Sequence, residues 1–268
     1  TRCSHVTGVQ TCALPISAPG SASGKLATSL SQLYHEAKQG VKAGYAKYET
    51  FPVWDLPLKH PVNMAYEAAT ADLNDKNMID FFHLEKYGIT TVNYNRDLET
   101  FPVLKEILTK ISGESIYHSP TDMGVNVLTQ CIFNYEVAET SAKAEIVRRY
   151  YRAMMDLKRG LIPQEIPERI KLLMNELGIS EMARLVVEKA EKKRQLANNL
   201  PSACVEVGRR YVVGRKTGYL SPISSTIINA IKQITKIPDE VDLIAPAILD
   251  PICSHRSEER RVGKECRS

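Results

Sequence analysis

The spacing of apolar residues predicts a mixture of helices and strands in the first part of the chain. Leu26, Leu30, Leu33 and Ala37 recur every three to four positions, which predicts a helix that ends near Gly40. The elements expected after it are an extended segment at 43–50, a helix from Pro61 to about 74, a short helix at 78–87, a strand at 89–93, and a helix at 96–111 that Pro102 kinks or divides.

The spacing becomes mainly helical after Ser119. A long helix is predicted over 136–159, and two more over 167–177 and 180–198. On the long helix, the side chains expected to point inward are Val137, Ala144, Val147, Tyr151, Met154 and Met155.

The last part of the chain mixes strands with helices. Residues 203–207 and 211–215 flank Gly208-Arg209-Arg210 and predict a hairpin. A helix at 221–236, a strand at 241–244 and a short helix at 246–252 should follow. The predicted fold class is therefore α/β: an incomplete α/β domain with a glycine-rich loop (17–112), a helical domain (113–200), and the start of an α+β domain (201–255).

Both ends of the chain match translated sequencing adapters. Residues 6–16 (VTGVQTCALPI) and 256–266 (RSEERRVGKEC) each correspond to an adapter read in frame. We therefore expect 1–16 and 256–268 to be foreign tails that pack against nothing, and 17–255 to be an internal fragment of a longer protein.

The tails change the charge balance. Of 35 basic and 31 acidic residues, the tails hold six and three, which leaves a net charge of +1 for 17–255. This near neutrality argues against a nucleic-acid partner. No apolar run approaches the ~18 residues that span a bilayer, which argues against a membrane partner. The remaining cysteines, Cys131, Cys204 and Cys253, suit free thiols in a reducing cytoplasm.

A P-loop-like stretch precedes the first helix. Gly20 and Gly24 allow backbone N–H groups to approach a phosphate, and Lys25 adds positive charge to the helix N-terminus. The standard P-loop, however, has glycine where Pro19 stands and a Mg²⁺-binding hydroxyl where Leu26 stands. Two interpretations remain open: a phosphate site, with a nucleotide and Mg²⁺ as the candidate cofactor, or a glycine–serine turn that caps a helix.

Polar residues are unusually dense between residues 56 and 104. His60, Asn63 and Glu67 are spaced to lie along one face of a helix. They form either a polar binding face or a set of caps and buried hydrogen bonds. A metal site is less favoured, because further His or Cys ligands and an HExxH motif are missing.

A second group follows the strand predicted at 89–93. Loops at the carboxyl ends of strands are where α/β sheets bind ligands, and Arg96 can hold a carboxylate or phosphate with two hydrogen bonds. Asn95 and Asp97 can equally be helix caps. The stretch Thr121-Asp122, with Asn126, can join the same cleft or cap a helix.

Cys131 follows an apolar run and has no histidine in a recognisable motif beside it. A buried structural thiol is therefore favoured over a nucleophile.

Several long strings carry a family resemblance. They are KHPVNMAYEAATADLND, NMIDFFHLEKYG, TTVNYNRDLETFPVL and SPTDMGVN. With them, the chain resembles the bacterial domain of unknown function 1846, also called uncharacterised protein family 0371, over essentially all of 17–255. The resemblance implies a protein of about twice this length with α/β, helical and α+β domains. The family's glycine loop is similar to APGPGSGK, whereas this chain has Ser21 and Ala22 in place of proline and glycine.

The leading hypothesis is a cytoplasmic protein that binds a phosphorylated small molecule or nucleotide in an α/β cleft. Lys25 and Arg96 would neutralise the anion, and Glu67 or Asp97 would act as a base or metal contact. The complete set of ligand-binding candidates is Gly20, Gly24, Lys25, Lys59, His60, Asn63, Asn95 and Arg96. We expect His60, Asn63, Glu67 and Arg96 to converge in one cleft. The alternatives are a non-catalytic structural or interaction protein and, third, a metal-dependent hydrolase; the full-length protein is a candidate homo-oligomer.

Overall fold

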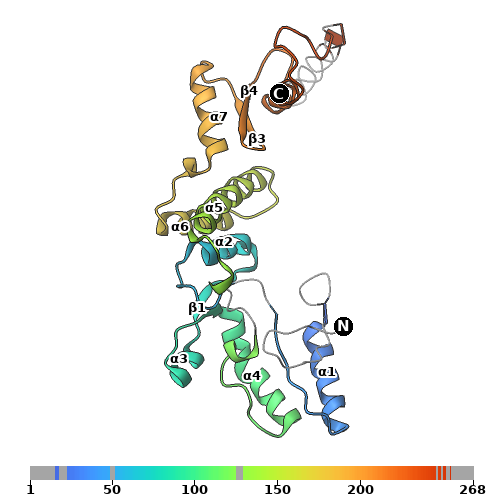
Figure 1. The fold of residues 1–268 in the computed structure, drawn as a ribbon, viewed down its shortest axis with the longest axis vertical. Helices are drawn as coiled ribbons and strands as arrows, with labels where there is room; N and C mark the ends of the chain where they lie inside the picture. Colours follow the sequence, from blue (N-terminus) through green and yellow to red (C-terminus); the bar gives the residue numbers. More distant parts are fainter. Residues whose placement is uncertain are drawn as a thin grey trace, which may run out of the picture. The chain divides into compact units, whose positions relative to one another are not determined.

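The computed structural model describes residues 16–17, 23–48, 52–124, 129–245, 247–248, 250–251 and 254. The chain divides into two compact units, Thr1–Leu173 and Met174–Ser268. Helices predominate, and the named strands form two separate antiparallel pairs (Figure 1). The fold therefore mixes helices with small sheets, while the three-domain division stays a prediction. The expected tails lie outside the described residues, apart from Ile16.

The first unit contains five helices and one small sheet among its described residues. The helices are α1 (Lys25–Lys38), α2 (Pro61–Ala69), α3 (Phe81–Tyr87), α4 (Asn95–Ser112) and α5 (Tyr135–Lys158). Short 3₁₀ turns lie at Ala71–Leu73 (η1), Thr121–Met123 (η2) and Thr129–Cys131 (η3). Strand β1 (Asn77–Ile79) pairs antiparallel with β2 (Val92–Tyr94), with Met78 opposite Asn93.

Polar side chains determine where three of these helices begin. His60, Asp80 and Asn134 precede α2, α3 and α5, and each accepts a backbone N–H from the first turn of its helix. Because the first N–H groups of a helix have no acceptor within it, such caps stabilise each helix by about 1 kcal/mol.

Helices α1 and α4 pack side by side over one apolar core (Figure 1). The buried members of that core are Leu33, Phe101, Leu108 and Met123. Tyr117 joins two segments at the border of this core. Its hydroxyl accepts from the N–H of Tyr45 at 2.7 Å and donates to the carbonyl of Tyr45 at 2.8 Å.

Several predicted elements of the first unit are wrong in detail. Met78 and Ile79 lie in a strand, and the helix predicted at 78–87 begins only after Asp80, whose side chain caps it. Within 43–48, Lys47 forms a single bridge to Gly124 and no strand is present. Helix α4 is not divided at Pro102; a proline inside a helix costs one hydrogen bond, which this long helix tolerates.

Helix α5 packs against α2 with a side that only partly matches the predicted one (Figure 1). It buries Ala142, Ile146, Val147 and Ala153. Of the side chains expected to point inward, Val147 is buried, whereas Val137, Met154 and Met155 are 60%, 42% and 50% exposed. The sequence offers two apolar stripes that share Val147, and the stripe with Ala142 and Ala153 packs inward because small side chains let helices approach closely.

The second unit is built on a hairpin. Strands β3 (Ser202–Val207) and β4 (Arg210–Arg215) pair antiparallel around Gly208, which confirms the predicted hairpin. It also holds the turn η4 (Glu181–Ala183) and the helices α7 (Leu185–Leu196) and α8 (Pro222–Thr235), while α6 (Glu165–Glu176) crosses the boundary between the units. The strand predicted at 241–244 is absent, and the helix predicted at 246–252 lies partly outside the described residues.

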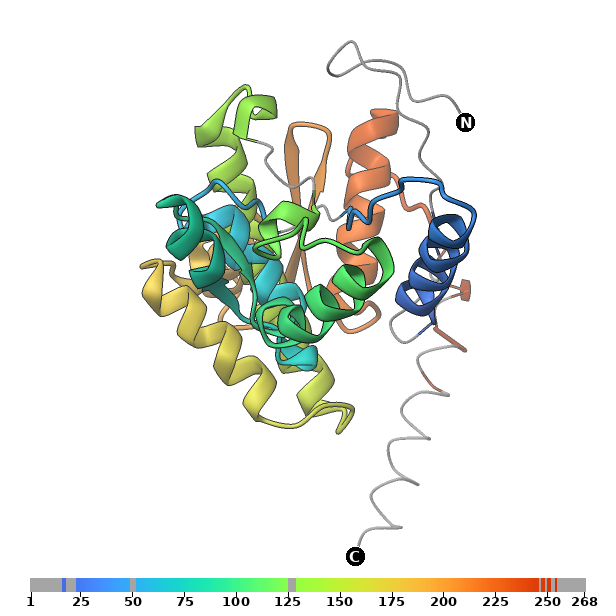
Figure 2. The same cartoon turned by 90° about the horizontal axis from the view of Figure 1, so that it is seen from below.

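Helices α7 and α8 both pack on the hairpin (Figures 1 and 2). Side chains alternate between the two sides of β4, so α8 contacts one side of the hairpin and α7 contacts the other. Val212 and Gly214 are buried on one side of the strand, where the backbone of Thr226 in α8 approaches Gly214. Cys204 lies on the other side with its cross-strand partner Val213. There the positive charge of Lys189 in α7 acts to lower the pKa of the Cys204 thiol.

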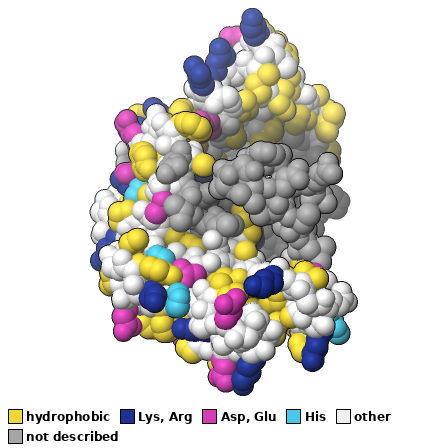
Figure 3. Space-filling model, turned by 60° about the horizontal axis from the view of Figure 1, so that its bottom comes forward, with side chains coloured by type: hydrophobic (Ala, Val, Ile, Leu, Met, Phe, Trp, Pro, Cys, Tyr) yellow, Lys and Arg dark blue, Asp and Glu magenta, His cyan; other side chains and the backbone are white. Residues whose placement is uncertain are grey.

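Charges are mixed on the surface rather than separated by sign. Figure 3 shows basic and acidic side chains near one another over much of one face. In α7, Glu188 pairs with Lys192 and Glu191 with Arg194, each one turn away. Among the described residues, no helix is long and apolar enough to cross a membrane.

Candidate functional site

No side chain of a described residue caps the N-terminus of α1. Gly24 precedes the helix with φ 82°, a left-handed conformation that glycine adopts without strain. The Nζ of Lys25 donates to the Oγ of Ser23 at 3.1 Å, so the ammonium group turns back toward the preceding loop. The first turn has no acidic residue. The positive end of the helix dipole and the ammonium group of Lys25 therefore lie close together at the start of α1. Gly20 lies outside the described residues.

His60 is a cap and faces α5. Its Nδ1 accepts the N–H of Val62 at 3.3 Å, and its Nε2 lies 3.4 Å from an oxygen of Glu139. Burial lowers the pKa of His60 below its usual value; Glu139 opposes this shift, and Lys143 adds to it. Neutral His60 can accept the Val62 hydrogen bond, whereas the protonated ring cannot.

This arrangement predicts a pH dependence. Because the pKa of His60 is lowered in the folded state, the unfolded chain binds a proton first as pH falls through about 6.5, and stability decreases there. We expect the free energy of unfolding to decrease by about 1 kcal/mol between pH 7.5 and 5.5, which is the stabilisation that a helix cap provides. Urea unfolding followed by Trp54 fluorescence measures it.

The control is His60→Asn, which keeps a capping side chain without a titrating group. Its stability should fall less over the same pH range than that of the wild type. Parallel curves for the two proteins would contradict the assignment.

Asn63 and Glu67 bind the backbone of neighbouring segments. Asn63 is fully buried; its Oδ1 accepts the N–H of Val53 at 2.7 Å, and its Nδ2 donates to the carbonyl of Val53 at 3.0 Å. Glu67 accepts the N–H of Asn77 at 3.1 Å, and the Nδ2 of Asn77 donates to the carbonyl of Asn63 at 2.9 Å. These contacts fix α2 to β1 and to the segment before α2.

Asn95 and Arg96 reach the segment that precedes β1. The Oδ1 of Asn95 accepts the N–H of Lys76 at 2.9 Å. Arg96 places Nη2 and Nε each 2.6 Å from a carboxylate oxygen of Asp75, which is 3% exposed. The Nη2 contact is a hydrogen bond, whereas the oxygen nearest Nε accepts no hydrogen bond from the described residues, so the pair is an ion pair with one hydrogen bond.

The remaining candidates lie elsewhere. Asp97 accepts from the Nζ of Lys47 at 2.6 and 2.8 Å. Lys59 is exposed on the turn before α2. The structure thus brings Asn63, Glu67, Asn95 and Arg96 to residues 75–77, whereas His60 and Asp97 have partners of their own. That the set faces one ligand cleft stays a prediction.

A buried polar network joins both strands of the first sheet to η2. Asp80, which is fully buried, accepts at one oxygen from the N–H and Oγ1 of Thr121 at 3.1 and 2.6 Å, and from Nδ2 of Asn93 at 3.4 Å. The Oγ1 of Thr121 also lies 2.8 Å from Oγ1 of Thr91. Asp80 and Asn93 lie in the polar stretch between residues 56 and 104, but nothing in the sequence predicted their pairing with Thr121, which is 41 and 28 residues away.

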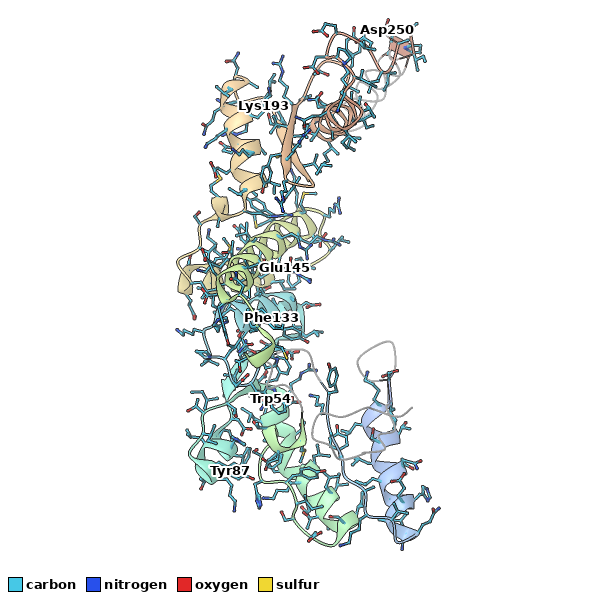
Figure 4. The ribbon with its side chains drawn as sticks, viewed as in Figure 1. Trp54, Tyr87, Phe133, Glu145, Lys193 and Asp250 are labelled. Atoms are coloured by element: carbon cyan, nitrogen blue, oxygen red, sulfur yellow. The ribbon has the colours of Figure 1, made fainter. Side chains whose placement is uncertain are left out.

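His83, Ser119 and Asp122 extend this network toward the surface. Nδ1 of His83 lies 2.8 Å from Oγ of Ser119 and 3.6 Å from Oδ1 of Asp122. The other oxygen of Asp122 accepts from the hydroxyl of Tyr87, which is labelled on α3 in Figure 4. A serine–histidine–aspartate nucleophile needs the hydroxyl and the acid at opposite ring nitrogens. Here both approach one nitrogen and Ser119 is fully buried, so the geometry is structural.

Comparison with known proteins identifies the family. A model described as "Domain of unknown function DUF1846, N-terminal" matches residues 6–178, and its C-terminal counterpart matches residues 182–262. The chain belongs to the DUF1846 family.

Curated relatives agree with this assignment. A UPF0371 protein of Streptococcus thermophilus is 51% identical over 239 residues, which are 89% of this chain and 48% of the relative. UPF0371 proteins of Streptococcus pneumoniae and Streptococcus sanguinis are 50% identical, with 88% of this chain and 48% of each relative covered. The chain spans about half the length of the curated relatives it matches.

The thiols of this DUF1846 chain differ from expectation in one respect. Cys131 is exposed at the end of the short turn η3, so the prediction of a buried thiol is wrong. Cys204 is partly buried, and burial raises the pKa of its thiol. Cys253 lies outside the described residues. Within the described ranges, no group of three or more His, Cys, Asp or Glu side chains is placed to hold a metal.

Proposed function

We propose that this DUF1846 protein binds a phosphorylated small molecule at the N-terminus of α1, within an α/β domain that the full-length protein completes. The N-terminus of α1, which no described side chain caps, carries the proposal. Backbone N–H groups there have no acceptor within the helix, Gly24 keeps the approach open, and Lys25 adds a cation. We propose a cytoplasmic location, which the free thiols of Cys131 and Cys204 support.

The other candidate residues support the fold in this proposal. Arg96 is neutralised by Asp75, and Asp97 by Lys47, so neither charge is directed at a ligand in this arrangement. We therefore assign anion binding to the glycine loop and α1, and not to residues 60–97.

The loop does not fit the Mg²⁺ position of a P-loop. Leu26 offers no oxygen there, and the hydroxyl of Thr28 donates to the carbonyl of Gly24 at 3.1 Å. The proposed ligand is therefore a phosphate-bearing molecule, with no step routed through a metal.

Replacement of Lys25 tests the proposal. In Lys25→Ala, we expect inorganic phosphate and ATP to bind about 10-fold to 100-fold more weakly, because one hydrogen bond to a charged group is lost. Calorimetry on the full chain measures the affinity, and Lys42→Ala is the matched control, since Lys42 is an exposed lysine beyond the end of α1. Equal binding by wild type and Lys25→Ala would leave Gly24 and Lys25 as a helix start only.

A non-catalytic structural or interaction role is the second candidate. It is favoured by one observation: the densest polar residues, Asn63, Asp80 and Asn93, hydrogen-bond within the fold. A chain that binds neither phosphate nor ATP would support this role. Homo-oligomerisation of the full-length protein fits either proposal and is measured by sedimentation.

A further inference from the structure

Helix α8 turns four of its five isoleucines away from the hairpin on which it packs. Ile223, Ile227, Ile231 and Ile234 are 66%, 51%, 44% and 61% exposed. At about 100° per residue, their spacing places all four within roughly 80° of one another around the helix. They form a continuous apolar stripe, here called the isoleucine face. Figure 2 shows α8 in orange-red beside the β3–β4 hairpin.

The side of α8 that packs on the hairpin carries small residues. Ser225, Thr226 and Ala230 are its buried positions, and Oγ1 of Thr226 donates to the carbonyl of Ala203 at 3.2 Å. Gly214 admits this close approach, because a Cβ there would meet the backbone and side chain of Thr226. A helix whose only partner was the hairpin would bury its isoleucines against it. The reverse orientation indicates a second packing partner.

The isoleucine face is uncharged. The only charged residue of α8 is Lys232, whose Nζ donates to the carbonyl of Asp239 at 2.8 Å. Helices that lie on membrane surfaces carry several basic residues on their polar side, which α8 lacks. An apolar protein segment therefore suits this face better than a lipid surface.

We propose that the isoleucine face docks a segment of the same polypeptide, from the half of the full-length protein that this chain does not span. The relatives are about twice as long as the matched region, so such a segment exists in them. The β3–β4 sheet has only two strands among the described residues, so further strands of the same polypeptide can still pair with its edges. More of the same chain would complete both layers. The inference is independent of the proposed anion site.

The size of the face argues against a second copy as the occupant. The four side chains together expose about as much surface as two fully exposed isoleucines. A stable interface between proteins uses about 20–30 residues on each side. A tethered segment can dock on a much smaller area, because its effective concentration is in the millimolar range.

Hydrogen exchange tests the proposal in two intact proteins. The exchange of α8 amides in this chain is compared with that of the corresponding helix in the full-length Streptococcus thermophilus relative. We expect exchange at least tenfold slower in the relative, because docking protects the helix. Equal exchange in both proteins would overturn the proposal.

Substitution adds a second readout. We expect Ile227→Asp with Ile231→Asp to lower Tm by less than about 2 °C in this chain, and the corresponding changes to lower it by more than about 5 °C in the relative. Leu196→Asp, at an 85% exposed apolar residue of α7, is the control and should be nearly silent in both. Equal Tm shifts in the two proteins would overturn the proposal. So would a dimer of this chain, seen in sedimentation, that the double substitution abolishes, since the occupant would then be a second copy.

Discussion

Replacing Asp80 with alanine should destabilise the first unit by about 3–4 kcal/mol. The substitution leaves the buried N–H of Thr121 without its acceptor, removes the carboxylate that the Oγ1 of Thr121 contacts at 2.6 Å, and removes the cap of α3. Each unsatisfied buried donor costs about 1–3 kcal/mol, and the cap about 1 kcal/mol. The free energy of unfolding of a whole domain is only about 5–15 kcal/mol, so the expected loss is a large fraction of the stability of this unit.

The chain provides its own reporter for this measurement. Trp54 is its single tryptophan, is 2% exposed, and accepts from the N–H of Val92 in β2 at 2.9 Å. Urea unfolding followed by Trp54 fluorescence therefore reports the first unit. Asp72→Ala, at an exposed aspartate of η1, is the matched control. A loss below about 1 kcal/mol for Asp80→Ala would show that the network does not hold the sheet to η2.

Replacing Gly124 with alanine should be similarly damaging. An added Cβ would overlap the ring of Trp54, with Cζ2 only 2.7 Å away and Cη2 still closer. The backbone at residue 124 and the buried indole of Trp54 would have to move apart. We therefore expect the free energy of unfolding to fall by about 3 kcal/mol, at the upper end of overpacking effects. Figure 4 shows where Trp54 lies in the fold.

Two readouts check this result. The emission of Trp54 should shift to longer wavelength as water reaches the ring, and the urea midpoint should fall. Gly218→Ala is the control, because nothing lies within 4 Å of the added Cβ and its φ is not in the left-handed region. If Gly124→Ala behaved like Gly218→Ala, the packing of Trp54 on residue 124 would be refuted.

Local features of the fold were predictable from sequence. The hairpin around Gly208 and the long helix α5 follow from turn residues and from apolar spacing within one element. Strand β1 was not predictable, because the three residues Asn77–Ile79 are too few to separate a strand from a helix by pattern. Its identity depends on pairing with β2, which is more than ten residues away.

The sequence indicated which polar residues belong to the candidate site, but not which partners they contact. Spacing correctly grouped Asn63 with Glu67, and both reach Asn77. No pattern within the sequence indicates that Arg96 pairs with Asp75 or that Asp80 pairs with Thr121. Such contacts arise when distant segments pack, and each buried polar group then takes whichever partner the fold supplies.

The pairing of Tyr45 with Tyr117 has a consequence for folding kinetics. Both hydrogen bonds join residues 72 positions apart, so a long loop must close before either forms. Loop closure costs entropy before such contacts are gained, and chains with many distant contacts fold slowly. The hairpin of the second unit closes across two residues, Gly208 and Arg209. During synthesis, this border of the α1–α4 core can therefore seal only after residue 117 has left the ribosome, whereas the hairpin can form as soon as β4 emerges.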